Sequence, residues 1–82
     1  MRYQMSLSDG AKRALRLLPK EYRQEIGFKL FLMQENLTGD VKKLKGSQNE
    51  YRLRVGNYRV KFRLEGSMIS VYTIGDRKDI YK

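Results

Sequence analysis

Two strand-length segments joined by Gly56-Asn57 constrain the fold of this chain more than any other feature. Apolar and cationic residues alternate through both segments, 51–55 and 58–64. Because successive side chains of a strand point to opposite faces of a sheet, each segment has one apolar and one cationic face. Gly-Asn is a dipeptide typical of tight β-hairpin turns. The sequence therefore predicts an antiparallel hairpin that buries one face and displays arginine and lysine on the other.

The two faces of this hairpin can be assigned residue by residue. The apolar face consists of Tyr51, Leu53, Val55, Tyr58, Val60, Phe62 and Leu64. The opposite face consists of Arg52, Arg54, Arg59, Lys61 and Arg63. Guanidinium groups hold phosphate oxygens in a bidentate, permanently charged fork, so this face suits a polyanionic ligand. We expect both tyrosines of the apolar face to lie in the core and not to stack on bases.

Two helices are predicted before the hairpin. Residues 2–7 alternate as in a short first strand, and Ser8 is suited to cap the helix that follows. Apolar residues spaced by three and four positions predict helices over 11–18 and 19–37, with Pro19 at the break between them. The helices therefore follow the first strand directly.

The remaining segments complete a small sheet. Residues 41–46 are interpreted as a basic connector, 68–74 as a third consecutive strand, and 75–79 as a loop. Large apolar residues occupy both faces of the segment 68–74, so the orientation of Tyr72 stays open. The order β-α-α-β-β-β predicts a single α+β domain over 1–82, with both helices on one face of a largely antiparallel sheet. The cationic face is then left open.

Charge is the strongest compositional signal. The chain has 18 Lys and Arg against 9 Asp and Glu, a formal net charge of +9. Residues 1–40 hold seven basic and five acidic side chains, net +2, whereas residues 41–82 hold eleven and four, net +7. Such clustering is typical of nucleic-acid-binding proteins. The sequence has no histidine and no cysteine, which excludes imidazole acid–base catalysis, thiolate metal sites and disulfides.

Hydropathy and the N-terminal residues bear on the compartment. No apolar run approaches the roughly 20 residues that a membrane-spanning helix needs. The first ten residues, MRYQMSLSDG, lack the apolar region of a signal peptide. We therefore expect a cytoplasmic protein without a membrane partner.

Three motifs occur together and in order: LKG at 44–46, YRLRVGNYRV at 51–60 and GDRKDIY at 75–81. With the predicted element order, they resemble the RelE/ParE superfamily of bacterial toxins, most closely the RelE-type ribosome-dependent mRNA endoribonucleases of toxin–antitoxin pairs. The resemblance covers nearly the whole chain. It implies a cognate antitoxin, action in the ribosomal A site and cleavage of mRNA without a cofactor. The chain ends at Lys82, where many relatives continue into a further helix, so neutralisation or closing of the site is expected to differ.

The resemblance also implies site residues. Arg59 matches the family's main transition-state arginine, Arg77 the arginine after the last strand, and Tyr81 the tyrosine near the C-terminus. The predicted RNA-binding residues are Arg52, Arg54, Lys61, Arg63, Lys43 and Lys45. Relatives often carry lysines where this chain has Arg52 and Arg54. Guanidinium is a poor proton acceptor, so a role of these two in proton transfer is not expected.

The chemistry of RNA cleavage agrees with these residue types. RNA supplies its own nucleophile, the 2′-hydroxyl, so a protein can cleave it without a metal. Arg59 and Arg77 are suited to stabilise the extra negative charge of the phosphorane. Tyr81 is a candidate base, because cationic surroundings favour the phenolate, and Lys61 is a weaker one. The group that accepts the 2′ proton stays open.

Two other functions stay open as well. One is a gyrase-directed toxin like ParE, although that branch generally lacks the full set of basic residues and tyrosine seen here. The other is a basic RNA-binding module that catalyses nothing.

Overall fold

The elements before the hairpin form where the local signals predict them. The computed structural model describes residues 2–80, beginning with β1 (Gln4–Leu7) and α1 (Asp9–Leu17). Ser8 caps α1, as predicted, by accepting a hydrogen bond from the Ala11 N–H at 3.1 Å. After Pro19, α2 (Lys20–Asn36) follows and ends at a residue in the left-handed conformation.

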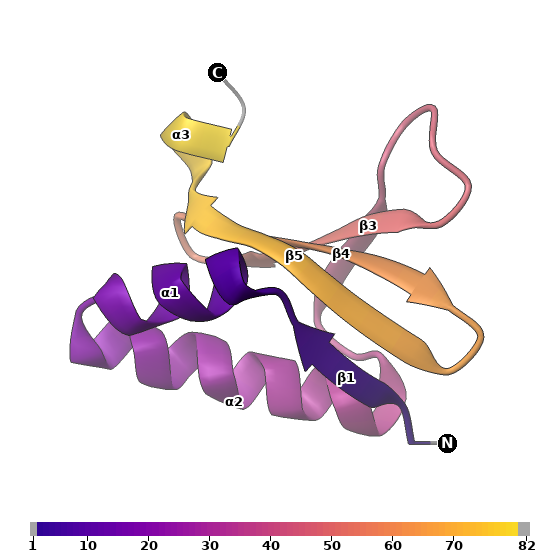
Figure 1. The fold of residues 1–82 in the computed structure, drawn as a ribbon, viewed down its shortest axis with the longest axis horizontal. Coiled ribbons are helices and arrows are strands. Elements are labelled where there is room, and N and C mark those ends of the chain that lie inside the picture. The colour runs from indigo at the N-terminus through magenta and orange to yellow at the C-terminus, as the bar shows by residue number, and fades with distance from the viewer. Residues whose placement is uncertain (1, 81–82) are drawn as a thin grey trace.

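The second half of the chain supplies four strands and a single helical turn. Their bounds are β2 (Asp40–Lys43), β3 (Glu50–Val55), β4 (Tyr58–Glu65), β5 (Met68–Asp76) and α3 (Arg77–Ile80). The five-stranded sheet has the order β1-β5-β4-β3-β2, in which β1 and β5 are parallel and the other pairs antiparallel. Helices α1 and α2 cover one face, and α3 lies on the side away from α2 (Figure 1). The predicted α+β class, with both long helices on one face of the sheet, is confirmed.

Two predicted connections are wrong. Residues 41–46 are not simply a basic connector, because the backbone of β2 pairs with β3 in a register that places Val41 opposite Leu53. Residues 75–79 are not a plain loop either, since β5 continues to Asp76 and α3 follows at once. Both segments are short and rich in charge, so their sequences carry little periodicity, and pairing with neighbouring elements decides their conformation.

The core lies between the two long helices and the apolar face of the sheet. Its buried side chains are Ala11, Ile26, Leu30, Met33, Leu53, Val55, Val60, Phe62, Ile69, Val71 and Ile74. The predicted inward face of the hairpin is confirmed. Tyr51 stacks on Phe62 with ring centroids 5.7 Å apart, and Tyr58 packs against Tyr22 at 5.0 Å. Both hairpin tyrosines thus pack against the core, as predicted.

A β-bulge in β5 resolves the orientation of Tyr72. Lys61 pairs with Thr73 whereas Phe62 pairs with Val71, so Tyr72 is an extra residue between two regular stretches. The bulge shifts the alternation by one position, which is why Val71 and Ile74 are both buried. Tyr72 is thereby turned to the face opposite the core, where its hydroxyl meets Glu50.

Candidate nucleic-acid interface

The open face of the sheet carries the cationic residues in cross-strand rows. Arg52 pairs with Lys61, and Arg54 pairs with Arg59, across β3 and β4. Directly opposed side chains of an antiparallel pair have Cβ atoms about 5 Å apart, so like charges meet here at close range. Such repulsion is unfavourable unless anions compensate it. The arrangement therefore favours a negatively charged ligand or a built-in counter-ion.

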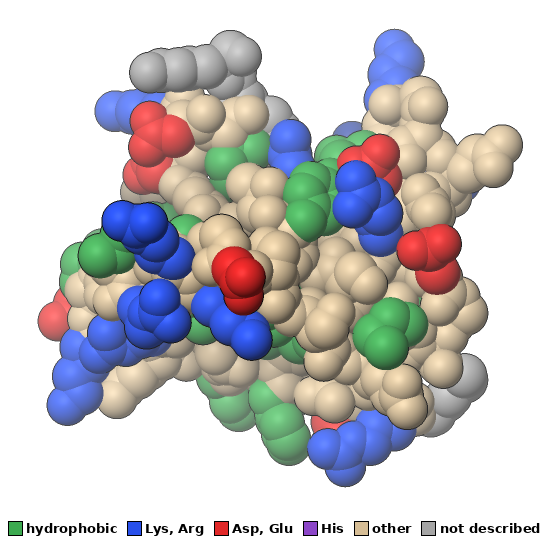
Figure 2. Space-filling view, viewed as in Figure 1, with side chains coloured by type: hydrophobic (Ala, Val, Ile, Leu, Met, Phe, Trp, Pro, Cys, Tyr) green, Lys and Arg blue, Asp and Glu red, His purple; other side chains and the backbone are tan. Residues whose placement is uncertain are grey.

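A pocket of about 380 Å³ opens at the β2 side of this face. It is lined by Lys42, Lys43, Leu44, Lys45, Arg52, Arg54 and Arg59. The pocket brings together five of the predicted site residues, and Lys42 is added by the folding of β2 onto β3. Lys and Arg side chains also gather over α1 and α2 (Figure 2). Those charges over α1 and α2 lie apart from the pocket, so they act on a ligand there through long-range electrostatics.

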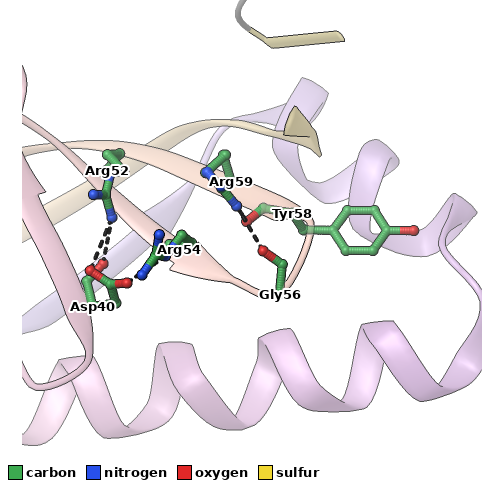
Figure 3. Close-up of polar contacts among 6 residues, drawn as sticks. All are labelled: Asp40, Arg52, Arg54, Gly56, Tyr58 and Arg59. Atoms are coloured by element: carbon green, nitrogen blue, oxygen red, sulfur yellow. Dashed lines mark hydrogen bonds and ion pairs between the residues drawn. The ribbon is translucent and has the colours of Figure 1, made fainter. Parts of the chain in front are cut away.

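Asp40 pairs with two of the pocket arginines (Figure 3). Its carboxylate lies 3.2 Å from Nη1 of Arg52 and 2.5 Å from Nε of Arg54. The hydrogen bond from Arg52 is the main reason that the pKa of Asp40 lies below its ordinary value of 3.8. Desolvation opposes this effect, and the hydrogen bond and charge of Arg54 lower the pKa further. Sequence reasoning missed Asp40, because the pairing depends on β2 lying beside β3 and the segment carries little periodicity that would predict a strand.

Arg59 lies on the predicted face but is enclosed. Only 7% of the residue is exposed, and Nη1 donates to the carbonyl oxygens of Gly56 at 2.8 Å and Tyr58 at 2.9 Å. Removing this side chain is therefore expected to cost the fold stability, because two backbone acceptors would lose their donor. The turn residue Gly56 adopts φ 58°, a conformation that favours glycine, and its carbonyl oxygen is one of the two acceptors. The tight hairpin turn thus fixes the guanidinium.

Arg77 begins α3 next to the same turn. Its backbone N–H donates to the carbonyl oxygen of Asn57 at 2.8 Å, and the carboxylate of Asp76 accepts from the Lys78 N–H at 2.8 Å. The side chain of Arg77 is exposed. Both predicted catalytic arginines are thus anchored to the β3–β4 turn. Tyr81, the third predicted catalytic residue, lies outside the described residues.

A second polar cluster lies at the other end of the face. The Tyr72 hydroxyl donates to the carboxylate of Glu50 at 2.5 Å, and the guanidinium of Arg63 lies 4.5 Å from the centre of the Tyr72 ring. Since β5 and β3 flank β4, the Tyr72 side chain must reach across β4 to make this bond. Sequence reasoning missed the contact because the bulge that turns Tyr72 is a property of strand pairing. Arg63 is thereby held against an aromatic ring.

Comparison with known structures decides the family. The fold matches a RelB–RelE antitoxin–toxin complex from Methanococcus jannaschii with a TM-score of 0.79 and 33% sequence identity, over 92% of this chain and 93% of that one. The chain belongs to the RelE toxin family. An archaeal RelE–RelB complex from Pyrococcus horikoshii OT3 is similar to this RelE-family chain with a TM-score of 0.80 and 25% identity, over 94% and 97% of the two chains.

Sequence comparison adds a shorter match to the same RelE family. A curated relative of this RelE-family chain, Toxin RelE3 of Methanocaldococcus jannaschii, is 48% identical over 42 residues. Those residues are 51% of this chain and 48% of the relative, so the alignment spans about half the length of that protein. No family model matches the sequence. The predicted resemblance to RelE-type toxins is confirmed at the level of the family.

No helix of residues 2–80 is long and apolar enough to cross a membrane. In the same range, no group of three or more acidic side chains is placed to hold a metal ion.

Proposed function

We propose that this chain is the toxin of a type II toxin–antitoxin pair and cleaves mRNA on the ribosome. The observation that carries the proposal is the pocket on the open sheet face, in which five predicted site residues, Lys43, Lys45, Arg52, Arg54 and Arg59, come together. Membership of the RelE family supports the toxin class. Action on the ribosome places the protein in the cytoplasm.

The enclosed guanidinium of Arg59 is suited to stabilise the transition state. The two hydrogen bonds to Gly56 and Tyr58 use the N–H groups of Nη1, which leaves the donors of Nε and Nη2 for a phosphate. When the 2′-oxygen attacks phosphorus, a bond to the 2′-oxygen forms and the bond to the 5′-oxygen breaks. Negative charge builds on the two non-bridging oxygens in between, while the 3′-oxygen stays bonded. A guanidinium that is already fixed and largely desolvated stabilises that charge without reorganising. Arg77, exposed beside the same turn, is assigned to the leaving 5′-oxygen.

Proton transfer is the second requirement of the reaction. The 2′-hydroxyl must lose a proton and the 5′-oxygen must gain one. Tyr81 remains the proposed base, with Lys61 as the alternative on the cationic face. The permanently charged arginines serve as electrostatic groups only. Because the pocket offers charge and few groups that could read bases, the ribosome is proposed to bend and present the message.

A cognate antitoxin is the second proposed partner. The relatives from Methanococcus jannaschii and Pyrococcus horikoshii were solved as complexes with their antitoxins. The helical layer of this chain leaves large apolar side chains exposed, namely Leu17, Tyr22, Phe28 and Phe31. Apolar exposure of this kind is typical of a surface that another chain covers. With a net charge of +9 on the toxin, an acidic antitoxin is expected.

The decisive experiment compares mRNA cleavage with and without translating ribosomes. Purified protein is added to a reconstituted translation reaction, and primer extension maps the 5′ ends of a reporter mRNA. We expect new ends only when ribosomes occupy the message, and none with Arg59→Ala. Equal cleavage of naked RNA would contradict ribosome dependence. Growth arrest with DNA damage and intact mRNA would instead identify a gyrase-directed toxin, and RNA binding without any cleavage would identify a binding module.

A further inference from the structure

Asp40 engages two of the arginines that line the pocket, Arg52 and Arg54, with the same groups that a bound phosphate would use. Its two carboxylate oxygens face different guanidinium groups, Oδ1 toward Arg52 and Oδ2 toward Arg54. A phosphate bound between these arginines would offer two oxygens in a similar arrangement. The carboxylate is therefore an internal anion on the cationic face, and an RNA phosphate must displace it before both arginines can be used.

The other contacts of Arg52 show what would hold its guanidinium in place if the Asp40 carboxylate moved away. Nη1 of Arg52 also donates to the backbone carbonyl oxygen of Asp40 at 3.0 Å, and only 16% of the Arg52 side chain is exposed. Burial and the backbone bond keep this guanidinium at the pocket wall. Arg54 is different. Its side chain is 53% exposed, and its Nε is held by the Asp40 carboxylate. Loss of the carboxylate therefore frees charge without dismantling the pocket.

We propose that Asp40 is a specificity-determining residue, an internal competitor of RNA phosphate that weakens binding to RNA not presented by the ribosome. The inference rests on the proposed function for its biological meaning. Its physical basis is independent, since Asp40 is 42% exposed and can swing away from the pocket when a phosphate arrives. A freely diffusing single strand must displace the carboxylate using its own binding energy alone. On the ribosome, further contacts contribute to that displacement.

The test is the salt dependence of binding to a short oligouridylate, followed by fluorescence anisotropy without ribosomes. We expect Asp40→Asn to bind the oligomer about three- to tenfold more tightly than the wild-type protein at low salt, which corresponds to the release of the Arg52 and Arg54 ion pairs. The slope of log K against log salt should steepen by about 0.7 for each guanidinium that gains a phosphate. Asp40→Glu, which keeps the carboxylate, should behave as wild type.

Glu25→Gln is the matched control, because it makes the same charge change at an exposed position of α2, on the other side of the sheet. An Asp40→Asn protein that shows only the affinity and slope of Glu25→Gln would overturn the proposal. Weaker binding by Asp40→Asn would overturn it too, because the carboxylate would then be ordering the arginines for RNA.

A double-mutant cycle gives a second, independent measurement. Arg54→Gln should weaken oligouridylate binding by a larger factor in the Asp40→Asn background than in the wild-type background, because only there is the guanidinium already free. Equal factors in the two backgrounds would contradict masking. Neither measurement needs catalysis, so a protein that meets both expectations but fails to cleave mRNA on ribosomes would refute the proposed function and leave the competition between Asp40 and phosphate standing.

Discussion

Arg59 of β4 and Gly75 of β5 are register partners, and Ile80 of α3 packs over the glycine. A Cβ atom added to Gly75 would lie 3.3 Å from Cγ1 of Ile80, closer than an ordinary contact. The missing side chain therefore lets α3 fold back onto the sheet beside the strand that holds Arg59. Arg77, at the start of α3, is positioned by the same arrangement.

Gly75→Val should separate α3 from the sheet. The added branches must displace Ile80, and with it the start of α3, at a cost of about 1–3 kcal/mol for overpacking. A shift of about 1 Å in a catalytic group can lower a rate by about 100-fold, so ribosome-dependent cleavage should fall steeply while the core stays folded. Thermal unfolding and the rate of mRNA cleavage measure the two effects. A folded variant with the wild-type rate would show that α3 does not position the site.

Arg59→Lys and Arg59→Ala should show whether cleavage needs only the positive charge of Arg59 or also its planar guanidinium. Both variants are expected to lose cleavage, because lysine keeps the charge but not the planar fork. Arg59→Ala should also lose about 1–3 kcal/mol in the free energy of unfolding, since the Gly56 and Tyr58 carbonyl oxygens lose their donor. Chemical denaturation measures the stability and primer extension the cleavage. Retained toxicity of a folded Arg59→Ala protein would remove Arg59 from the site.

Gly27→Ala should stabilise the protein without touching the site. Gly27 lies inside α2, and a Cβ atom added there would meet no neighbour within 4 Å. Alanine is favoured over glycine inside a helix by up to about 1 kcal/mol, which raises the melting temperature by roughly 4–8 °C in a domain of this size. Scanning calorimetry measures the shift. The cleavage rate should be unchanged, and a lower rate would connect α2 to the catalytic face.

Acid should remove the stabilisation that Asp40 supplies. The pKa of Asp40 is lower in the folded protein than its ordinary value of 3.8. Its ion pairs therefore stabilise the fold above that value, and their contribution is lost as the pH falls through the folded-state pKa. Wild type should be more stable than Asp40→Asn at neutral pH, with a difference that shrinks below the ordinary pKa. Urea unfolding of both proteins at neutral pH and at a pH below 3.8 measures this stability difference. A difference that does not change with pH would contradict the ion pairing of Asp40.

Much of the fold follows from local patterns in the sequence. The alternation over 51–55 and 58–64 defined the buried and the cationic faces of the hairpin, because side-chain direction in a strand depends only on position along it. Ser8 and Pro19 marked the beginning and the end of α1 through backbone hydrogen bonding and sterics. The motifs, read in order, predicted the toxin family that comparison with known structures then confirmed.

Local sequence patterns were enough to predict which hairpin residues face the core, which form the cationic face, and which toxin family the chain resembles. The three-dimensional arrangement was needed to show that β2 joins the sheet, that a bulge turns Tyr72 outward, that Arg59 is enclosed, and that the Asp40 carboxylate pairs with both Arg52 and Arg54. Each of these depends on which strands lie side by side and in what register. Register is a relationship between distant segments, so no local pattern along the chain contains it.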